Sequence, residues 1–291
     1  MRESPLAGIL AGLVAASIWG GMYVVSKVIL EIIPPFTLLS TRLLLGALTL
    51  ALVLSLQKDV VWDRKMVREA FLVGMVGYGV SLSLQFVGTK LSTASNGALV
   101  TSATPAFVLL FAPRLLGERN TPRRILALAL ATIGVAAVID PRTAELSPGL
   151  FRGNLALFGA GLTWALYSVL VRKVTGAGGV LAASMVMLLG GLPISLPLAA
   201  LEIPAQGIGE ITAGVVAGVL FLGIVSTALA MFLWNYAFAE LPAAVASLTF
   251  FAQPVVGTTL GWFFLREQIT PLFLLGGALI TAGLVIASRQ A

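Results

Sequence analysis

Long uninterrupted runs of apolar residues constrain this chain more than any other feature. Each run is about 20 residues long, which in a helix matches the hydrocarbon thickness of a bilayer. Backbone groups find no water there, so they must pair within a helix or in a closed barrel, whose strands need only about ten residues. The run length therefore predicts an all-α integral membrane protein. Of the 291 residues, only 10% are charged and 58% are hydrophobic, which excludes an ordinary soluble domain.

Charged residues, prolines and glycines divide the apolar sequence into ten predicted transmembrane helices. The first five are 6–26, 35–56, 69–89, 92–113 and 122–139, and the second five are 153–171, 179–201, 211–238, 243–265 and 271–288. The apolar stretch that follows Met1 continues to Val25, so we expect a first span rather than a cleavable signal peptide.

The two halves of the sequence resemble each other. At a shift of 145 (164 minus 19), Trp19 and Lys27 match Trp164 and Arg172. At a shift of 149 (254 minus 105), the matched pairs are Gly74 with Gly223, Pro105 with Pro254, Glu118 with Glu267, Thr121 with Thr270, Pro122 with Pro271 and Gly134 with Gly283. We expect two five-helix repeats, residues 1–145 and 146–291, in one structural unit. An odd number of spans inverts the second repeat, an architecture that recurs in secondary transporters.

The distribution of basic residues predicts the orientation in the membrane. Loops on the side of the N-terminus carry twelve Lys or Arg residues, against five on the other side. This bias places both termini in the cytoplasm. The formal net charge of +6 is then explained by topology, and we expect no nucleic-acid partner. The chain has no Cys and no His, and we expect neither a metal nor a cofactor.

Three features together indicate a family. They are the paired tryptophans, the mid-span prolines, and the Leu-Gly-Glu sequence at 116–118, which matches Leu-Arg-Glu at 265–267 in the second half. With them the chain resembles an EamA-type member of the drug/metabolite transporter superfamily, and within it bacterial exporters of aromatic and other neutral amino acids. The resemblance implies an inner-membrane exporter with Trp19, Tyr78 and Trp164 beside a central cavity. Arg266 departs from the glycine that the family pattern has before Glu267.

Aromatic and polar side chains on shared helix faces form the candidate substrate site. Such faces suit an amphipathic neutral solute, because the rings desolvate its side chain while amides and hydroxyls bind its polar end. The candidate substrate-binding residues are Trp19, Tyr78, Ser81, Leu82, Gln85, Thr101, Trp164, Tyr167, Ser168, Phe250 and Gln253. Tryptophans also anchor helices at membrane interfaces, and single polar residues also join helices, which is the role we expect for Asn96.

Two prolines interrupt predicted spans at matched positions. Pro105 and Pro254 each remove the hydrogen bond to a carbonyl four residues earlier, those of Thr101 and Phe250. Neighbouring helices can tolerate such a kink. Because the kink recurs in both repeats, we favour a hinge beside the substrate site.

Charged residues near the spans are expected to be mainly structural. Arg42 is the only basic residue well inside a span, and we rank snorkelling to the interface or bonding to backbone carbonyls above capture of a substrate carboxylate. Glu118 and Glu267 end two spans, and the Thr-Pro pairs that follow them, at 121–122 and 270–271, are predicted to start the next helices. No predicted span has a carboxylate in its interior, so coupling through a buried Glu, as in small multidrug transporters, is not expected.

The favoured function is a secondary transporter that exports small neutral metabolites, including aromatic amino acids, by alternating access across a bacterial-type cytoplasmic (inner) membrane. The chain has no phosphate-binding glycine loop, which excludes an ATPase of its own. The alternatives are a carrier of nucleotide-sugars or sugar-phosphates, which one interior Arg serves poorly, and a non-transporting membrane scaffold. An enzyme is not expected, because His, Cys and paired carboxylates at membrane depth are lacking. Substrate, direction of transport, energy coupling and oligomeric state stay open.

Overall fold

The structure is a computed structural model that describes residues 5–57, 62–117, 122–139, 147–174, 179–241 and 243–288. In these residues it contains helices and no strands. Seven helical stretches are long and apolar enough to cross a membrane, namely Leu6–Ile29, Pro35–Ser55, Arg64–Leu91, Ala94–Leu116, Pro148–Val174, Val180–Gln206 and Ala213–Glu240. The chain is therefore an all-α, multi-pass membrane protein.

The helices follow the apolar runs of the sequence closely. The first half contains α1 (Pro5–Ile29), α2 (Pro35–Ser55), α3 (Arg64–Gly74), η1 (Met75–Ser81), α4 (Leu82–Leu91), α5 (Ala94–Thr101), α6 (Thr104–Leu116) and α7 (Pro122–Ile139). The second contains α9 (Pro148–Val174), α10 (Val180–Gln206), α11 (Ala213–Leu220), η2 (Phe221–Leu229), α12 (Ala230–Glu240), α13 (Ala243–Leu248), η3 (Thr249–Phe251), α14 (Ala252–Leu265) and α15 (Pro271–Ser288). The predicted spans 122–139, 243–265 and 271–288, which are not among the seven stretches, coincide with α7, with α13 to α14, and with α15.

Two features of the helices were not predicted. The segments η1 and η2 are π-helical and lie inside the stretches Arg64–Leu91 and Ala213–Glu240. In addition, α10 continues to Gln206, so Glu202 lies inside a helix and is 7% exposed. Glu202 lies four residues before the end of α10 and just outside the predicted span 179–201, so it does not contradict the expectation that no predicted span has a carboxylate in its interior.

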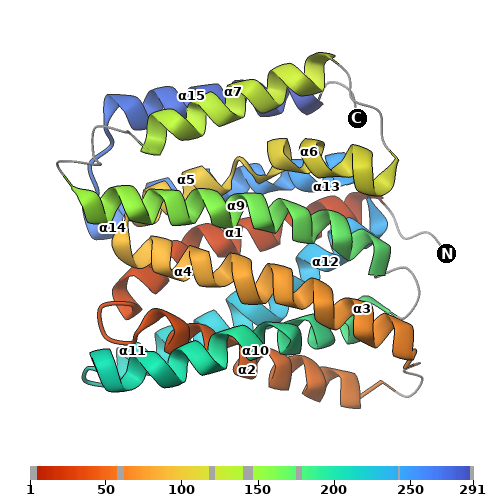
Figure 1. Ribbon diagram of the computed structural model, residues 1–291, viewed down its shortest axis with the longest axis vertical. Coiled ribbons are helices and arrows are strands. Elements are labelled where there is room, and N and C mark those ends of the chain that lie inside the picture. Colours follow the sequence, from red (N-terminus) through yellow and green to blue (C-terminus); the bar gives the residue numbers. More distant parts are fainter. Residues whose placement is uncertain are drawn as a thin grey trace.

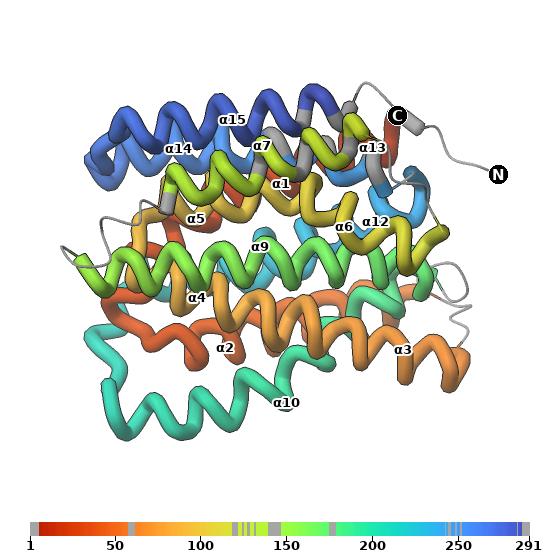
Figure 2. The backbone as a smooth tube through the Cα atoms, turned by 45° about the horizontal axis from the view of Figure 1, so that its top comes forward, coloured from red at the N-terminus to blue at the C-terminus, as the bar shows by residue number. Residues whose placement is uncertain are grey.

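The helices run side by side along one axis, with α1 near the centre (Figure 1). The pair α7 and α15 lies along one edge of the molecule, and α2 and α10 lie at the opposite edge (Figures 1 and 2). Glycines permit the closest approaches between helices. A Cβ added to Gly134 of α7 would lie 2.7 Å from the Gly276 carbonyl oxygen of α15, and one on Gly190 of α10 would lie 2.2 Å from the Phe71 carbonyl oxygen of α3.

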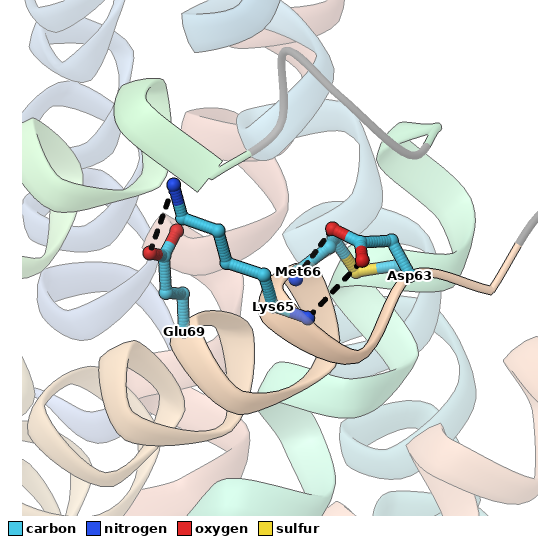
Figure 3. A network of polar contacts seen from close by, with 4 residues as sticks. All are labelled: Asp63, Lys65, Met66 and Glu69. Carbon is cyan, nitrogen blue, oxygen red and sulfur yellow. Dashed lines mark hydrogen bonds and ion pairs between the residues drawn. The ribbon is translucent and has the colours of Figure 1, made fainter.

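Side chains cap several helix ends. Asp63 accepts hydrogen bonds from the Lys65 and Met66 amides at the start of α3, beside an exposed Lys65–Glu69 ion pair of 4.0 Å (Figure 3). The Thr270 hydroxyl accepts from the Phe273 amide at 3.1 Å, which confirms the predicted start of α15. The matching residues Glu118 and Thr121 lie outside the described residues.

Two carboxylates cap helices to which they are not connected in sequence. Glu267 accepts hydrogen bonds from the Ala94 amide at 2.7 Å and the Ser95 amide at 2.8 Å, at the start of α5. Glu202 accepts from the Phe36 amide at 2.7 Å, at the start of α2. Helix N-termini favour negative charge, so both contacts stabilise the helices that they cap.

Lys27 joins the last turn of α1 to the end of α4. Lys27, in the last turn of α1, donates to the carbonyl oxygens of Thr89, Lys90 and Ser92 at 3.2, 2.8 and 2.6 Å. These carbonyls end α4, where the helix dipole favours a cation. The interhelical contacts of Lys27, Glu202 and Glu267 thus gather at the end of the bundle opposite to the first turn of α1.

Candidate functional site

A central cavity lies between helices from both halves of the chain. The space inside it that a water-sized sphere can reach is about 20 Å³, so the cavity is nearly closed in this conformation. Its lining residues are Trp19, Met22, Tyr23, Arg42, Ser81, Leu82, Gln85, Thr101, Ala160, Trp164, Met231, Phe250 and Gln253. The structure thus brings together eight residues of the predicted site: Trp19, Ser81, Leu82, Gln85, Thr101, Trp164, Phe250 and Gln253.

Aromatic rings form one wall of this cavity. Trp19 of α1 and Trp164 of α9 make a T-shaped contact with ring centroids 5.5 Å apart. Trp19 also lies 5.3 Å from Trp234 and 5.8 Å from Phe250. The two paired tryptophans are only 3% and 6% exposed, so they do not anchor the protein at the membrane interface.

A hydrogen-bond network lines the cavity with polar groups. The Thr101 hydroxyl donates to the Gly97 carbonyl, so it accepts from Gln253 Nε2 at 2.7 Å and from the Tyr23 hydroxyl at 2.8 Å. Because its proton goes to Thr101, Tyr23 accepts from Gln85 Nε2 at 2.6 Å. These bonds fix the orientation of the Gln85 amide. Its oxygen, Oε1, is buried and has no hydrogen-bond partner among the described residues.

Arg42 of α2 lies in the cavity wall and is 0% exposed. Its Nε donates to Thr227 Oγ1 at 2.7 Å. Its terminal nitrogens reach the Ser226 hydroxyl and carbonyl oxygens at 3.3 and 3.4 Å and the Met22 sulfur at 3.6 Å. The guanidinium carbon lies 5.0 Å from the centre of the Phe86 ring. Of the two structural roles expected, bonding to a backbone carbonyl is confirmed, and snorkelling to the interface is wrong because the side chain is fully buried.

The π-helical segments supply part of the polar wall. Ser81, the last residue of η1, donates to the Ala160 carbonyl at 2.8 Å. In η2, the Ser226 carbonyl accepts hydrogen bonds from Trp19 Nε1 at 3.0 Å and from Arg42. π-helical turns are frequent at functional sites, where they turn backbone groups toward side-chain partners.

Three predicted site residues lie behind the cavity rather than in its wall. The hydroxyls of Tyr78 and Tyr167 are 2.5 Å apart, and Tyr167 donates to Asn235 Oδ1 at 2.8 Å. Both rings stack near Trp164, at 6.0 and 4.6 Å. Ser168 donates to the Trp164 carbonyl at 2.9 Å. The two tyrosine rings thus hold the Trp164 ring in position.

The cavity contains five residues that the sequence did not single out for the site. They are Met22, Tyr23, Arg42, Ala160 and Met231. Met22 and Tyr23 follow Trp19 by three and four positions, a spacing that places all three on one helix face and was a usable signal. Asn96, by contrast, donates to Asn154 Oδ1 at 3.1 Å outside the cavity, which confirms its expected role between helices.

Both prolines sit where the helix is interrupted. Pro105 lies in the first turn of α6, after a turn at 102–103, and Pro254 lies in the first turn of α14, after η3. The carbonyl of Thr101 that Pro105 leaves free accepts a hydrogen bond from the Thr104 hydroxyl at 2.7 Å. Both breaks adjoin the cavity, because Thr101 and Phe250 line it.

The profile of the EamA-like transporter family matches residues 6–139 and again residues 151–289. The two matches together span nearly the whole chain, and each covers one half of it.

Individual relatives are similar along most of their length. The chain is 23% identical to the uncharacterized transporter YoaV of Bacillus subtilis over 95% of both chains. It is 28% identical to a probable terminal-alkyne amino-acid exporter of Streptantibioticus cattleyicolor, over 86% of this chain and 82% of that one. A crystal structure with 21% identity superposes with a TM-score of 0.70 over 99% of both chains, which shows a shared fold. The chain belongs to the EamA-like transporter family.

Proposed function

We propose that this protein is a secondary transporter that exports neutral amino acids, including aromatic ones, by alternating access. The observation that carries the proposal is the contact of Trp19 with Trp164 in the cavity wall. These residues match across the two halves of the sequence, so one solute in the cavity touches both halves. Exchange of the conformations of two similar halves is a known route to alternating access.

The architecture that we propose has ten transmembrane helices in two inverted repeats of five. The separate family matches to residues 6–139 and 151–289 support the division. The paired helix breaks at Pro105 and Pro254 and the two π-helical segments also support it. With both termini in the cytoplasm of a bacterial-type cell, the contacts of Lys27, Glu202 and Glu267 lie at the external end.

An amino-acid solute is favoured by the chemistry of the wall. Trp19, Trp164 and Phe250 provide an apolar surface that suits an aromatic side chain, and Gln85, Thr101 and Gln253 provide neutral polar groups beside it. The name of the relative from Streptantibioticus cattleyicolor agrees with this class of solute. The cavity wall has one Arg and no Lys, which disfavours the sugar-phosphate alternative.

The test is uptake by the purified protein in liposomes. A panel of labelled neutral amino acids, a sugar-phosphate and a nucleotide-sugar are compared, each with and without a proton gradient. We expect saturable uptake of phenylalanine or another neutral amino acid and none of the phosphorylated solutes. Uptake of a phosphorylated solute alone, or flux of no solute of the panel, would contradict the proposal.

A further inference from the structure

The positive charge of Arg42 has no anionic partner in the part of the chain that the structure describes. The ion pair found there joins Lys65 to Glu69 at the surface. A guanidinium carries five N–H donors and stays protonated in proteins. One of them, on Nε, has a good acceptor in Thr227. The four on the terminal nitrogens meet only three acceptors, two oxygens of Ser226 and the sulfur of Met22, and none is nearer than 3.3 Å.

Such an arrangement is costly inside a membrane protein. An uncompensated buried charge costs several kcal/mol, and intramembrane charges mark solute or ion pathways for this reason. The Phe86 ring at 5.0 Å offsets only part of that cost. Because Arg42 lines the cavity, an anionic group on the occupant is positioned to supply the missing charge.

Two other buried groups of the cavity wall lack partners. Trp164 Nε1 is a donor and Gln85 Oε1 is an acceptor, and neither has a hydrogen bond within the described residues. The Gln85 oxygen is free because its nitrogen is held by Tyr23. The wall thus offers two donors, one of them charged, and one acceptor. Buried polar groups are normally paired, so the occupant is expected to complete them.

We infer that Arg42 binds the carboxylate of the transported solute and that Gln85 Oε1 accepts a hydrogen bond from its ammonium group. The indole N–H of Trp164 donates a second hydrogen bond to the carboxylate. The occupant is then a zwitterionic α-amino acid, an inference that rests on the proposed transport function and names the recognition of its head group. A phosphate monoester carries about −1.5 to −2 charges and would leave excess negative charge beside a single Arg, whereas a carboxylate matches it.

Binding of three related probes tests this inference without requiring transport. The probes are L-phenylalanine, L-phenylalaninamide, which lacks the carboxylate, and 3-phenylpropionate, which lacks the ammonium group. Dissociation constants are measured by quenching of tryptophan fluorescence in detergent, and phenylalanine uptake is measured in liposomes. The wild-type protein should bind phenylalanine at least about tenfold more tightly than the amide, as expected for a charge-assisted pair.

The variants separate the two ends of the solute. Arg42→Gln should weaken phenylalanine and 3-phenylpropionate by about tenfold or more and should not weaken phenylalaninamide. Gln85→Met should weaken phenylalanine and phenylalaninamide by about fivefold and leave 3-phenylpropionate within about twofold. Arg64→Gln, at the exposed start of α3, is the matched control and should change none of the three. If Arg42→Gln does not fold, Arg42→Lys should retain the preference for phenylalanine over its amide, because it keeps the charge.

The outcomes distinguish this inference from the proposed function. One outcome is that the Arg42→Gln protein transports phenylalanine and still prefers it to phenylalaninamide as strongly as the wild type does. That result would overturn the inference and leave the proposed function intact. A second outcome is that the wild-type protein transports no amino acid but binds 3-phenylpropionate, and that Arg42→Gln weakens this binding. That result would overturn the proposed function and leave the anion site intact. A folded wild-type protein that transports phenylalanine but does not prefer it to the amide would also overturn the inference.

Discussion

The indole rings of Trp19 and Trp164 meet nearly perpendicular to each other, with planes at 89° and centroids 5.5 Å apart. One ring comes from α1 and the other from α9, so the contact joins the two halves of the chain. Edge-to-face aromatic pairs contribute about 0.5–1.5 kcal/mol beyond the burial of their surface. Since both rings line the cavity, movement of either half reshapes the space in which a solute binds.

Removal of the Trp164 ring is expected to impair transport more than folding. Trp164→Ala should lower the initial rate of phenylalanine uptake in liposomes by about tenfold or more, because it removes the apolar wall and one donor. The matched control is Trp262→Ala in α14, whose side chain is 59% exposed. The control should retain the wild-type rate, and equal rates for both variants would exclude Trp164 from the site.

The helix breaks before the prolines are expected to serve movement rather than binding. In Pro105→Ala with Pro254→Ala, both residues regain an N–H group that can continue the helix across the break. We expect slower uptake, by about fivefold, and a phenylalanine dissociation constant within about twofold of wild type.

Pro197→Ala is the matched control for these prolines, because Pro197 lies inside α10, is exposed and does not line the cavity. It should leave uptake unchanged. A double variant with wild-type uptake would remove the hinge from the account. A double variant that loses binding as much as uptake would assign the prolines to the site instead.

Glu267 is expected to contribute to stability by capping α5. Glu267→Ala removes the acceptor of the Ala94 and Ser95 amides and should lower the free energy of unfolding by about 1–2 kcal/mol. The measurement is the midpoint of thermal unfolding in detergent. Glu240→Ala, at the exposed end of α12, is the control and should unfold near the wild-type midpoint. An unchanged midpoint for Glu267→Ala would show that the cap is energetically neutral.

Arg266 is expected to lower the stability of the folded protein. Its φ of 55° lies in the left-handed region, as does the φ of 72° at Gly117, the matched position after α6. This region costs a residue with a Cβ about 1–2 kcal/mol relative to glycine. Arg266→Gly should therefore raise the midpoint of thermal unfolding, whereas Gln268→Gly, two residues later, should not. A lower midpoint for Arg266→Gly would mean that the Arg side chain makes a stabilising contact.

The positions of the helices could be predicted because they depend on local sequence. Runs of apolar residues define the helices, and the Thr270-Pro271 pair marks the start of α15. The break before Pro105 could also be predicted, because it follows from a single residue and its place in a run. The full burial of Arg42 could not, because it depends on which helices pack against it.

Relationships between helices could not be predicted from one sequence. The residues Tyr78 and Tyr167 share faces with the cavity residues, as their spacing indicated, but their hydroxyls pair with each other and with Asn235. Which partner satisfies a buried group depends on which helices pack together. The same limit applies to Glu202, whose acceptor role at the start of α2 joins residues far apart in sequence.

Counterflow in liposomes tests the central claim, carriage of a neutral amino acid by alternating access, most directly. Initial uptake of labelled phenylalanine is compared between liposomes preloaded with unlabelled phenylalanine and liposomes that contain buffer. We predict a severalfold faster initial uptake into preloaded liposomes, because a carrier returns faster with solute bound, and we predict that Trp164→Ala abolishes the difference. Phenylalanine uptake at the same rate whatever the liposomes contain, or the absence of any uptake, would contradict the account.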